Sequence, residues 1–186
     1  MEGKFENSAL IIIDVQKGFD FVDYWGKRNN LQAEENIAKL ISYWREKNRK
    51  IIFIKHMSKN PKSTLYPGQI GNDYKEIVAP REDDVLFHKQ VHSGFIGTDL
   101  EAYLRKNDIK KVVITGIATN FCVSTTARMA GDLGFETYVV NDGTACFDKK
   151  DFDGSIIPAE TVHKVSLANL HQEFASVVNT ADLLNK

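Results

Sequence analysis

Three residues whose side chains could carry out covalent chemistry each follow a separate apolar run. Asp14 comes directly after ALIII, Lys89 ends DVLFHK, and Cys122 lies in GIATNFC, at the end of KVVITG. A carboxylate can take the proton of a thiol, and an ammonium favours negative charge nearby. The set predicts attack by Cys122 on a carbonyl or similar carbon, with Asp14 as general base and Lys89 steadying the charges.

Each of the three residues also has an ordinary structural interpretation. An aspartate after a strand often forms a turn, and a lysine there is usually solvated. A lone cysteine near a helix start is often a small buried hydrophobe. The catalytic interpretation therefore depends on convergence, which the surrounding elements must provide.

Apolar runs alternate with amphipathic stretches along the chain, and this alternation predicts parallel strands covered by helices on both faces of the sheet. In such a sheet the carboxyl ends of the strands lie on one side, where ligands bind. Asp14, Lys89 and Cys122 are therefore expected to meet there. The expected strands are 9–13, 51–54, 84–89, 111–116, 136–140 and 174–178, and the main helices are 31–47, about 120–133 and 158–170.

Local signals place several boundaries. Asn30 is expected to cap the helix at 31–47, and Thr98 with Glu101 to form a capping box. Gly134 suits the end of the helix that begins near 120. The Pro- and Gly-containing stretch 57–80 predicts a long, functional loop.

The start of the helix near 120 is the expected nucleophile position. If Thr119 or Asn120 caps it, Cys122 lies in the first turn, where the helix dipole favours a thiolate. Free backbone N–H groups there would form an oxyanion hole.

Bulk composition narrows the class of protein. A chain of 186 residues fits a single domain over 1–186, and a formal charge of -1 gives no electrostatic case for a nucleic-acid or membrane partner. The apolar runs are far shorter than a membrane span, and the polar start lacks a signal sequence, so a cytoplasmic protein with two free thiols is expected. Neither GxGxxG nor a P-loop follows any strand, which argues against a nucleotide cofactor.

An ordered set of motifs resembles the isochorismatase-like cysteine hydrolases, which include nicotinamidases and N-carbamoylsarcosine amidohydrolases. The motifs are IIIDVQKGF, Lys89 followed by SGF, TGIATNFCVSTTARMA, VVNDGTA and the C-terminal ASVVNTADLL. The resemblance implies a doubly wound, Rossmann-like α/β fold of about six parallel strands, with Asp14, Lys89 and Cys122 as the triad. It also implies a cis peptide between Ile117 and Ala118, an oxyanion hole from the N–H groups of Ala118 and Cys122, and a homodimer or homotetramer.

One departure from the family pattern concerns a metal. Nicotinamidases hold a metal through a DxH motif after the second strand, and the corresponding stretch here reads IKH, with Ile54 in place of the aspartate and His56 retained. A single histidine is a poor site for a divalent cation. We therefore expect no intrinsic metal and no cofactor. His56 would serve equally as a pocket wall, a substrate hydrogen-bonder or a structural histidine.

An aromatic wall around the nucleophile would suit a small, flat or uncharged acyl group. About half of these aromatic residues are expected to belong to the core instead. The candidate pocket residues are Phe19, Phe21, Trp25, His56, His92, Phe95 and Phe121.

These features together predict a hydrolase of a small-molecule amide or related C–N bond, acting through a thioester. The first alternative is vinyl ether hydrolysis on the same fold, which protonation by Asp14 could drive without Cys122. A binding protein on a degenerate hydrolase scaffold is a second alternative. A phosphatase of the haloacid dehalogenase type is disfavoured, because Gln16 stands where its second aspartate would be.

Overall fold

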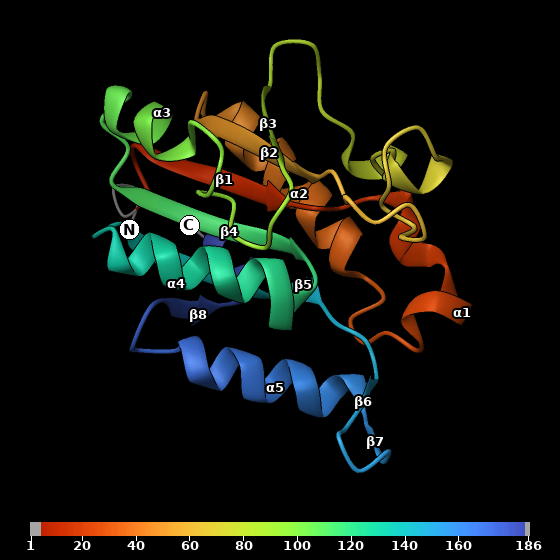
Figure 1. Cartoon of the computed structure of the whole chain (residues 1–186). Coiled ribbons are helices and arrows are strands. Elements are labelled where there is room, and N and C mark those ends of the chain that lie inside the picture. The colour runs from red at the N-terminus through yellow and green to blue at the C-terminus, as the bar shows by residue number, and fades with distance from the viewer. Residues whose placement is uncertain (1–4, 185–186) are drawn as a thin grey trace.

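Six strands lie side by side in one parallel sheet, in the order β3-β2-β1-β4-β5-β8 (Figure 1). The structure is a computed structural model that describes residues 5–184. The strands are β1 (Ser8–Ile13), β2 (Lys50–His56), β3 (Val85–Lys89), β4 (Lys111–Ile117), β5 (Glu136–Ala145) and β8 (Ser176–Val178). Every predicted strand is present, and β2, β4 and β5 extend further at their carboxyl ends than the apolar runs indicated.

Helices cover both faces of this sheet. Leu10 and Ile12 of β1 share a core with Trp44 on one face, whereas Ile11 shares a core with Ala127 on the other. The first face carries α2 (Ala33–Glu46) and α6 (Thr180–Leu184); the second carries α3 (Leu100–Lys106), α4 (Ser124–Asp132) and α5 (Ala159–Leu170). The predicted doubly wound α/β fold is confirmed.

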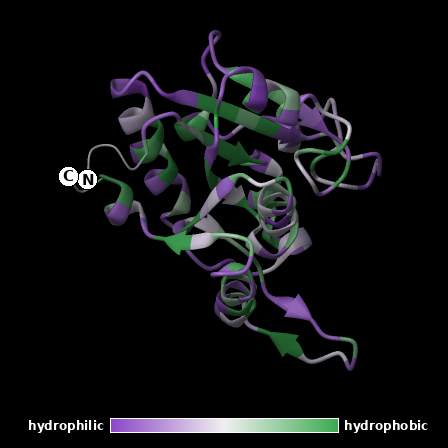
Figure 2. Ribbon diagram, turned by 90° about the vertical axis from the view of Figure 1, so that its left-hand side faces the viewer, coloured by the Kyte–Doolittle hydropathy of each residue, from purple (hydrophilic) through white to green (hydrophobic). Residues whose placement is uncertain are grey.

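The central strands are apolar on both faces because neither face meets water. All six residues of β1 are buried, and so are Val112–Ile117 of β4. Figure 2 shows these apolar residues gathered in the strands at the middle of the molecule.

Short helical turns and a small hairpin lie in the loops at the edge of the sheet where the strands end. The loop before α2 holds a 3-10 turn (Lys17–Asp20) and α1 (Val22–Trp25), and the predicted long loop at 57–80 holds 3-10 turns at Ile70–Asn72 and Glu76–Val78. A two-stranded hairpin of β6 (Lys149–Lys150) and β7 (Ile156–Ile157) protrudes beside α5 (Figures 1 and 2).

Two of the expected helix caps are wrong. Helix α2 begins at Ala33, and the Asn30 side chain instead donates to the carbonyls of Asn141 and Thr144 across the fold. Helix α3 begins at Leu100, and Glu101 pairs with Arg105 instead of closing a capping box. The partners of Asn30 lie more than a hundred residues away, whereas the partner of Glu101 lies one turn along the same helix.

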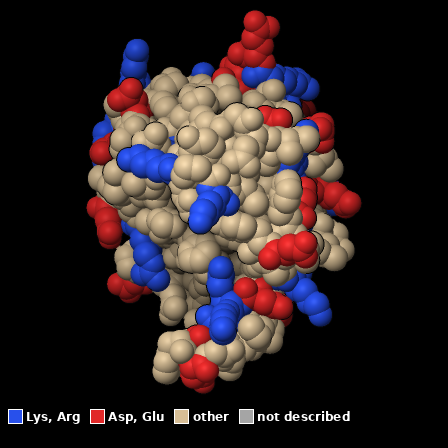
Figure 3. All heavy atoms as spheres, turned by 45° about the vertical axis from the view of Figure 1, so that its right-hand side comes forward, with Lys and Arg blue, Asp and Glu red and all other residues tan. Residues whose placement is uncertain are grey.

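The described part of the chain contains no helix long and apolar enough to cross a membrane. Lysine, arginine, aspartate and glutamate side chains are scattered together over the face shown in Figure 3.

Candidate active site

The parallel register brings the predicted catalytic residues to one edge of the sheet. Asp14 directly follows β1, and its backbone N–H donates to the carbonyl of Ile54 on β2 at 2.9 Å. Lys89 is the last residue of β3, where it pairs with His56, the last residue of β2. Asp14 has a positive φ of 52°, a conformation that aspartate tolerates better than most residues and that turns the chain away from the sheet.

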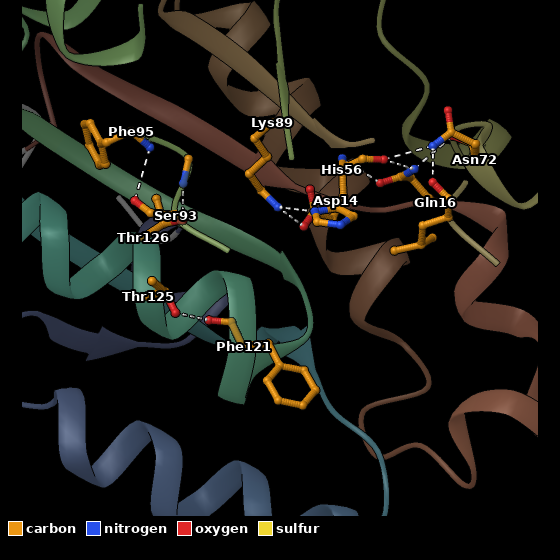
Figure 4. Close-up of polar contacts among 12 residues, drawn as sticks. Asp14, Gln16, His56, Asn72, Lys89, Ser93, Phe95, Phe121, Thr125 and Thr126 are labelled. Carbon is orange, nitrogen blue, oxygen red and sulfur yellow. Dashed lines mark hydrogen bonds and ion pairs between the residues drawn. The ribbon is translucent and has the colours of Figure 1, made fainter. Parts of the chain in front are cut away.

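Asp14 and Lys89 form a fully buried ion pair. The Lys89 ammonium donates to Asp14 Oδ2 at 2.6 Å, and neither side chain has any exposed surface (Figure 4). Burial alone would lower the pKa of Lys89, but the negative charge of Asp14 and the hydrogen bond to it help to raise this pKa overall, so the ammonium stays charged. Asp14 Oδ1 is buried without a hydrogen-bond partner among the described residues. Oδ2 thus accepts from the Lys89 ammonium, and Oδ1 is left free to accept a proton.

His56 fills the gap between these two residues, because β2 lies between β1 and β3. Its Nδ1 is 3.1 Å from Lys89 Nζ, and an ammonium can only donate, so Nδ1 must be unprotonated. Burial and the charge of Lys89 lower the pKa of His56, which agrees with a neutral ring. The backbone of Val91 opposes this lowering only in part. These contacts make His56 a support for Lys89.

Gln16 and Asn72 fix the backbone of His56, and sequence reasoning missed both roles. Gln16 accepts from the His56 N–H at 2.9 Å and donates to the His56 carbonyl at 3.1 Å. Asn72, from the loop at 57–80, donates to the same carbonyl at 2.9 Å (Figure 4). Gln16 is fully buried two residues after Asp14, and a polar residue so close to a buried strand end was the available signal.

Cys122 lies in the turn that joins β4 to α4. The Ile117–Ala118 peptide bond is cis, and the next five residues, Thr119–Val123, form a single π-helical turn. Such turns are rare and are frequent at functional sites. The ligand atoms of Cys122, Asp14 and His56 all lie within 4.8 Å of one another. The sequence-predicted triad is therefore assembled in space.

The resting Cys122 side chain is a thiol, which corrects the expectation of a thiolate favoured by the helix start. Burial raises its pKa, the charge of Asp14 raises it further, and Lys89 opposes both effects only in part. Only 7% of the residue is exposed. A thiol of this kind reacts as a nucleophile only after a base takes its proton, and the Asp14 carboxylate has an oxygen within 4.8 Å of Cys122 Sγ.

A metal ion does not fit this arrangement well. Asp14, His56 and Cys122 have spacing suitable for metal ligation, but the Lys89 ammonium already contacts Asp14 Oδ2 and His56 Nδ1. A cation bound there would lie close to a buried positive charge, which opposes its binding. Ile54, in the position of the missing aspartate, is fully buried in the core.

The aromatic wall is only partly assembled. Phe19 stacks on Phe147 in the α2-side core and Phe95 stacks on Phe135 in the opposite core, so both rings pack inside the protein and their part in a pocket stays a prediction. Buried space beneath the loops takes these rings because burying them stabilises the fold.

The remaining candidates divide into three positions. Phe121, next to Cys122, is half-buried between the exposed ring of His92 at 6.0 Å and Lys149 Nζ at 4.4 Å. Trp25 ties two loops together by donating to the Gly18 carbonyl and Thr64 Oγ1. Phe21 is exposed. Phe121 and His92 are thus the aromatic residues that the structure brings together near the nucleophile turn.

The segment that carries His92 is fastened to α4. The Gly94 N–H donates to Thr126 Oγ1 at 2.9 Å, and Ser93 Oγ contacts Met129 Sδ at 3.0 Å. Figure 4 shows this segment beside Thr126. The SGF motif therefore has a structural basis, because it anchors the chain between β3 and α3 to the helix that follows Cys122.

This fold and this triad define an isochorismatase-like hydrolase. A family model for the isochorismatase domain matches residues 8–182, so the chain belongs to this family. An isochorismatase family protein of Bacillus subtilis, YrdC, is 50% identical over 180 residues that cover 97% of this chain and 96% of its own. A solved structure of an isochorismatase-family protein from Chromobacterium violaceum is 43% identical with a TM-score of 0.91, covering 95% of this chain and 91% of its own.

More distant relatives carry names that state an activity. Nicotinamidase 3 of Arabidopsis thaliana is 27% identical, covering 92% of this chain and 84% of its own. Ureidoacrylate amidohydrolase RutB of Caulobacter vibrioides is 34% identical over 118 residues, which cover 63% of this chain and 48% of its own. A solved structure of a cysteine hydrolase from Pseudomonas syringae pv. phaseolicola is 26% identical with a TM-score of 0.86, covering 95% of this chain and 90% of its own.

Proposed function

We propose that this hydrolase cleaves a C–N bond of a small-molecule amide through a thioester on Cys122. The observation that carries the proposal is the asymmetry of Asp14, whose Oδ2 is held by Lys89 while its buried Oδ1 has no partner, in a carboxylate with an oxygen within 4.8 Å of Cys122 Sγ. A carboxylate oxygen held in this way is a general base with a fixed position.

In the first half of the reaction, Sγ of Cys122 attacks the substrate carbonyl carbon and the thiol proton passes to Asp14 Oδ1. The new C–S bond turns the carbonyl oxygen into an oxyanion, which the N–H groups of Ala118 and Cys122 bind. The oxyanion then collapses, the C–N bond breaks, and the leaving nitrogen takes the proton from Asp14. Ammonia or an amine departs, leaving a thioester on Cys122.

In the second half, Asp14 takes a proton from water as the water oxygen attacks the thioester carbon. The C–S bond breaks, the carboxylic product leaves, and the proton on Asp14 returns to the sulfur. Lys89 stays protonated throughout, so that each transfer occurs beside a compensating positive charge.

Unpartnered acceptors near the nucleophile support an amide as substrate. Asn120 Oδ1, in the same turn as Cys122, is buried and has no partner among the described residues. Buried acceptors without partners favour a ligand that brings N–H donors, because an unsatisfied polar group is costly. The named activities of the nicotinamidase and the ureidoacrylate amidohydrolase point to the same bond type.

A turnover screen with matched variants tests the proposal. Wild type, Cys122→Ala and Cys146→Ser would be assayed on nicotinamide, ureido acids and N-carbamoyl amino acids, with intact-mass spectrometry to detect the acyl-enzyme. Cys146 is the control, because its thiol contacts the Ala159 carbonyl in the core and a serine hydroxyl can make the same contact. We expect turnover in wild type and Cys146→Ser, and none in Cys122→Ala. Full turnover by Cys122→Ala would overturn the thioester route.

Vinyl ether hydrolysis is distinguished by the same variants. That reaction needs a proton from Asp14 and no sulfur, so Cys122→Ala would retain it while Asp14→Asn would lose it. Incubation with EDTA is a further check, because a reaction that uses Asp14, Lys89 and Cys122 alone should keep its full rate after chelation.

We also propose that the protein acts in the cytoplasm, where its free thiols stay reduced, and that it forms a homodimer or homotetramer. Phe152, on the protruding hairpin, is 99% exposed, which suits a contact with another molecule. Light scattering coupled to gel filtration would give the oligomeric state directly; a monomeric mass would overturn the second proposal.

A further inference from the structure

The VVNDGTA motif forms a wide bulge that the proposed mechanism leaves without a role. Ile114 pairs with Val139 and Gly116 pairs with Thr144, so β5 contains extra residues opposite a short piece of β4. Bulges of this kind often lie next to active sites, where they redirect side chains. Here the bulge directs Asn141 toward α5.

A chain of hydrogen bonds runs from this bulge to the nucleophile turn. Asn141 Oδ1 is 3.0 Å from Nε2 of His163 on α5, and His163 Nδ1 is 2.9 Å from Thr119 Oγ1. Thr119 is fully buried and is the first residue of the π-helical turn that carries Cys122. His163, which is 3% exposed, thus connects Asn141 to Thr119.

The surrounding partners determine which nitrogen of His163 carries the proton. Asn30 Nδ2 lies 3.3 Å from Nε2, but its two hydrogens go to the carbonyls of Asn141 and Thr144 at 2.9 and 2.8 Å. Nε2 therefore donates to Asn141 Oδ1, and Nδ1 is left to accept from the Thr119 hydroxyl. Burial lowers the pKa of His163, in agreement with a neutral ring.

We propose that His163 is a positioning residue for the nucleophile, which holds Thr119 and thereby sets the place of Cys122. Thr119 Oγ1 has no other polar contact among the described residues, so loss of Nδ1 leaves a buried hydroxyl unsatisfied. The Thr119 hydroxyl can find another partner only if the π-helical turn moves, and Cys122 would move with the turn. The inference rests on the proposed function, because it treats Cys122 as the nucleophile.

Two pairs of variants separate positioning from stability, all on a Cys146→Ser background. In His163→Asn, the side-chain oxygen on Cγ takes the place of Nδ1 and the contact with Asn141 is lost. In His163→Gln, the amide reaches the place of Nε2 and the contact with Thr119 is lost. Thr119→Ser keeps the hydroxyl, and Thr119→Val removes it. Each His163 variant thus loses one of two hydrogen bonds. Only His163→Gln loses the bond to Thr119, which lies in the turn that carries Cys122.

The readouts are the rate of Cys122 alkylation by iodoacetamide at pH 7 and the melting temperature. We expect Cys122 in His163→Gln and in Thr119→Val to be alkylated at about one-tenth of the wild-type rate or below, since small displacements of a reacting group have large effects on rate. His163→Asn and Thr119→Ser should stay close to the wild-type rate, although their melting temperatures also fall. The double variant His163→Gln/Thr119→Val should be no slower than either single one.

Two contrary results have different meanings. Wild-type labelling in His163→Gln, or rates that follow melting temperature across all four variants, would overturn the positioning role alone. A Cys122 labelling rate that is unchanged in Asp14→Asn would overturn the proposed function and this inference with it.

Discussion

At the scale of single residues, the Asp14–Lys89 pair is the most demanding feature of the site. Both side chains have no exposed surface, so removing either partner leaves an uncompensated buried group. We expect Asp14→Asn and Lys89→Met each to lower the free energy of unfolding by about 3–5 kcal/mol. The double variant should lose less than the sum, because it leaves no lone charge. Urea unfolding measures all three, and strictly additive losses would contradict the coupling.

The sequence located the triad because each member stands where a strand must end. His56 was harder to assign, since its pairing with Lys89 depends on β2 lying between β1 and β3. The packing of Phe19 and Phe95 in the cores was not predictable from the sequence, because aromatic residues in loops look alike whether they line a pocket or fill a core. Only tertiary packing separates the two.

At the scale of elements, Gly116 is what lets β4 approach β1 beside the nucleophile turn. A Cβ at this position would collide with the backbone of Ile13, and φ is +128°. Gly134, after α4, has φ +83° but open space around it. Gly116→Ala should therefore cost more than about 3 kcal/mol, and Gly134→Ala only about 1 kcal/mol. Thermal unfolding of the two variants checks this; equal losses would mean that backbone strain alone matters.

A charge cluster joins the two loops that border the site. Glu34, in the first turn of α2, binds Arg28 with both oxygens at 2.6 Å and also binds Lys75 at 2.6 Å. Burial raises the pKa of Glu34, but the hydrogen bonds and charges of Arg28 and Lys75 outweigh this and lower it overall. The carboxylate therefore remains charged between its two partners.

Neutralising that carboxylate should loosen both loops. The side chains of Arg28, Glu34 and Lys75 are about one-tenth exposed, so Glu34→Gln should cost about 3 kcal/mol by leaving Arg28 with a neutral partner and Lys75 with the carboxylate of Asp20 alone. Glu35→Gln, an exposed neighbour in the same turn, should change stability by less than about 0.5 kcal/mol. Urea midpoints compare the two, and similar losses would show that the cluster adds nothing specific.

The elements themselves followed from the sequence far better than the connections between them did. Apolar runs mark strands because both faces of the sheet are covered. Asn30 looked like a helix cap, yet its amide holds the β5 bulge more than a hundred residues away. The bulge is equally hidden, because it is defined by a register between β4 and β5 that no local pattern encodes.

At the scale of the whole molecule, two histidines, the half-buried His56 and the buried His163, should make the fold sensitive to acid. Burial is the main cause that lowers the pKa of both His56 and His163, so the folded state binds fewer protons than the unfolded chain. The stability that the neutral histidines contribute is therefore fully present above about pH 6.5, the ordinary pKa of histidine, and is lost as the pH falls below it.

The urea midpoint should consequently fall between pH 7 and pH 5, well before Glu34 takes up a proton. His163→Asn should have a lower midpoint at pH 8 but a shallower fall toward pH 5. It removes one of the two histidines that bind a proton more readily in the unfolded chain than in the folded protein. A midpoint that stays level from pH 8 to pH 5 would contradict the neutral His56 and His163 rings on which both the Lys89 contact and the Thr119 contact depend. Acid sensitivity of the whole fold therefore reports on the same two hydrogen bonds that arrange the nucleophile and its ammonium partner.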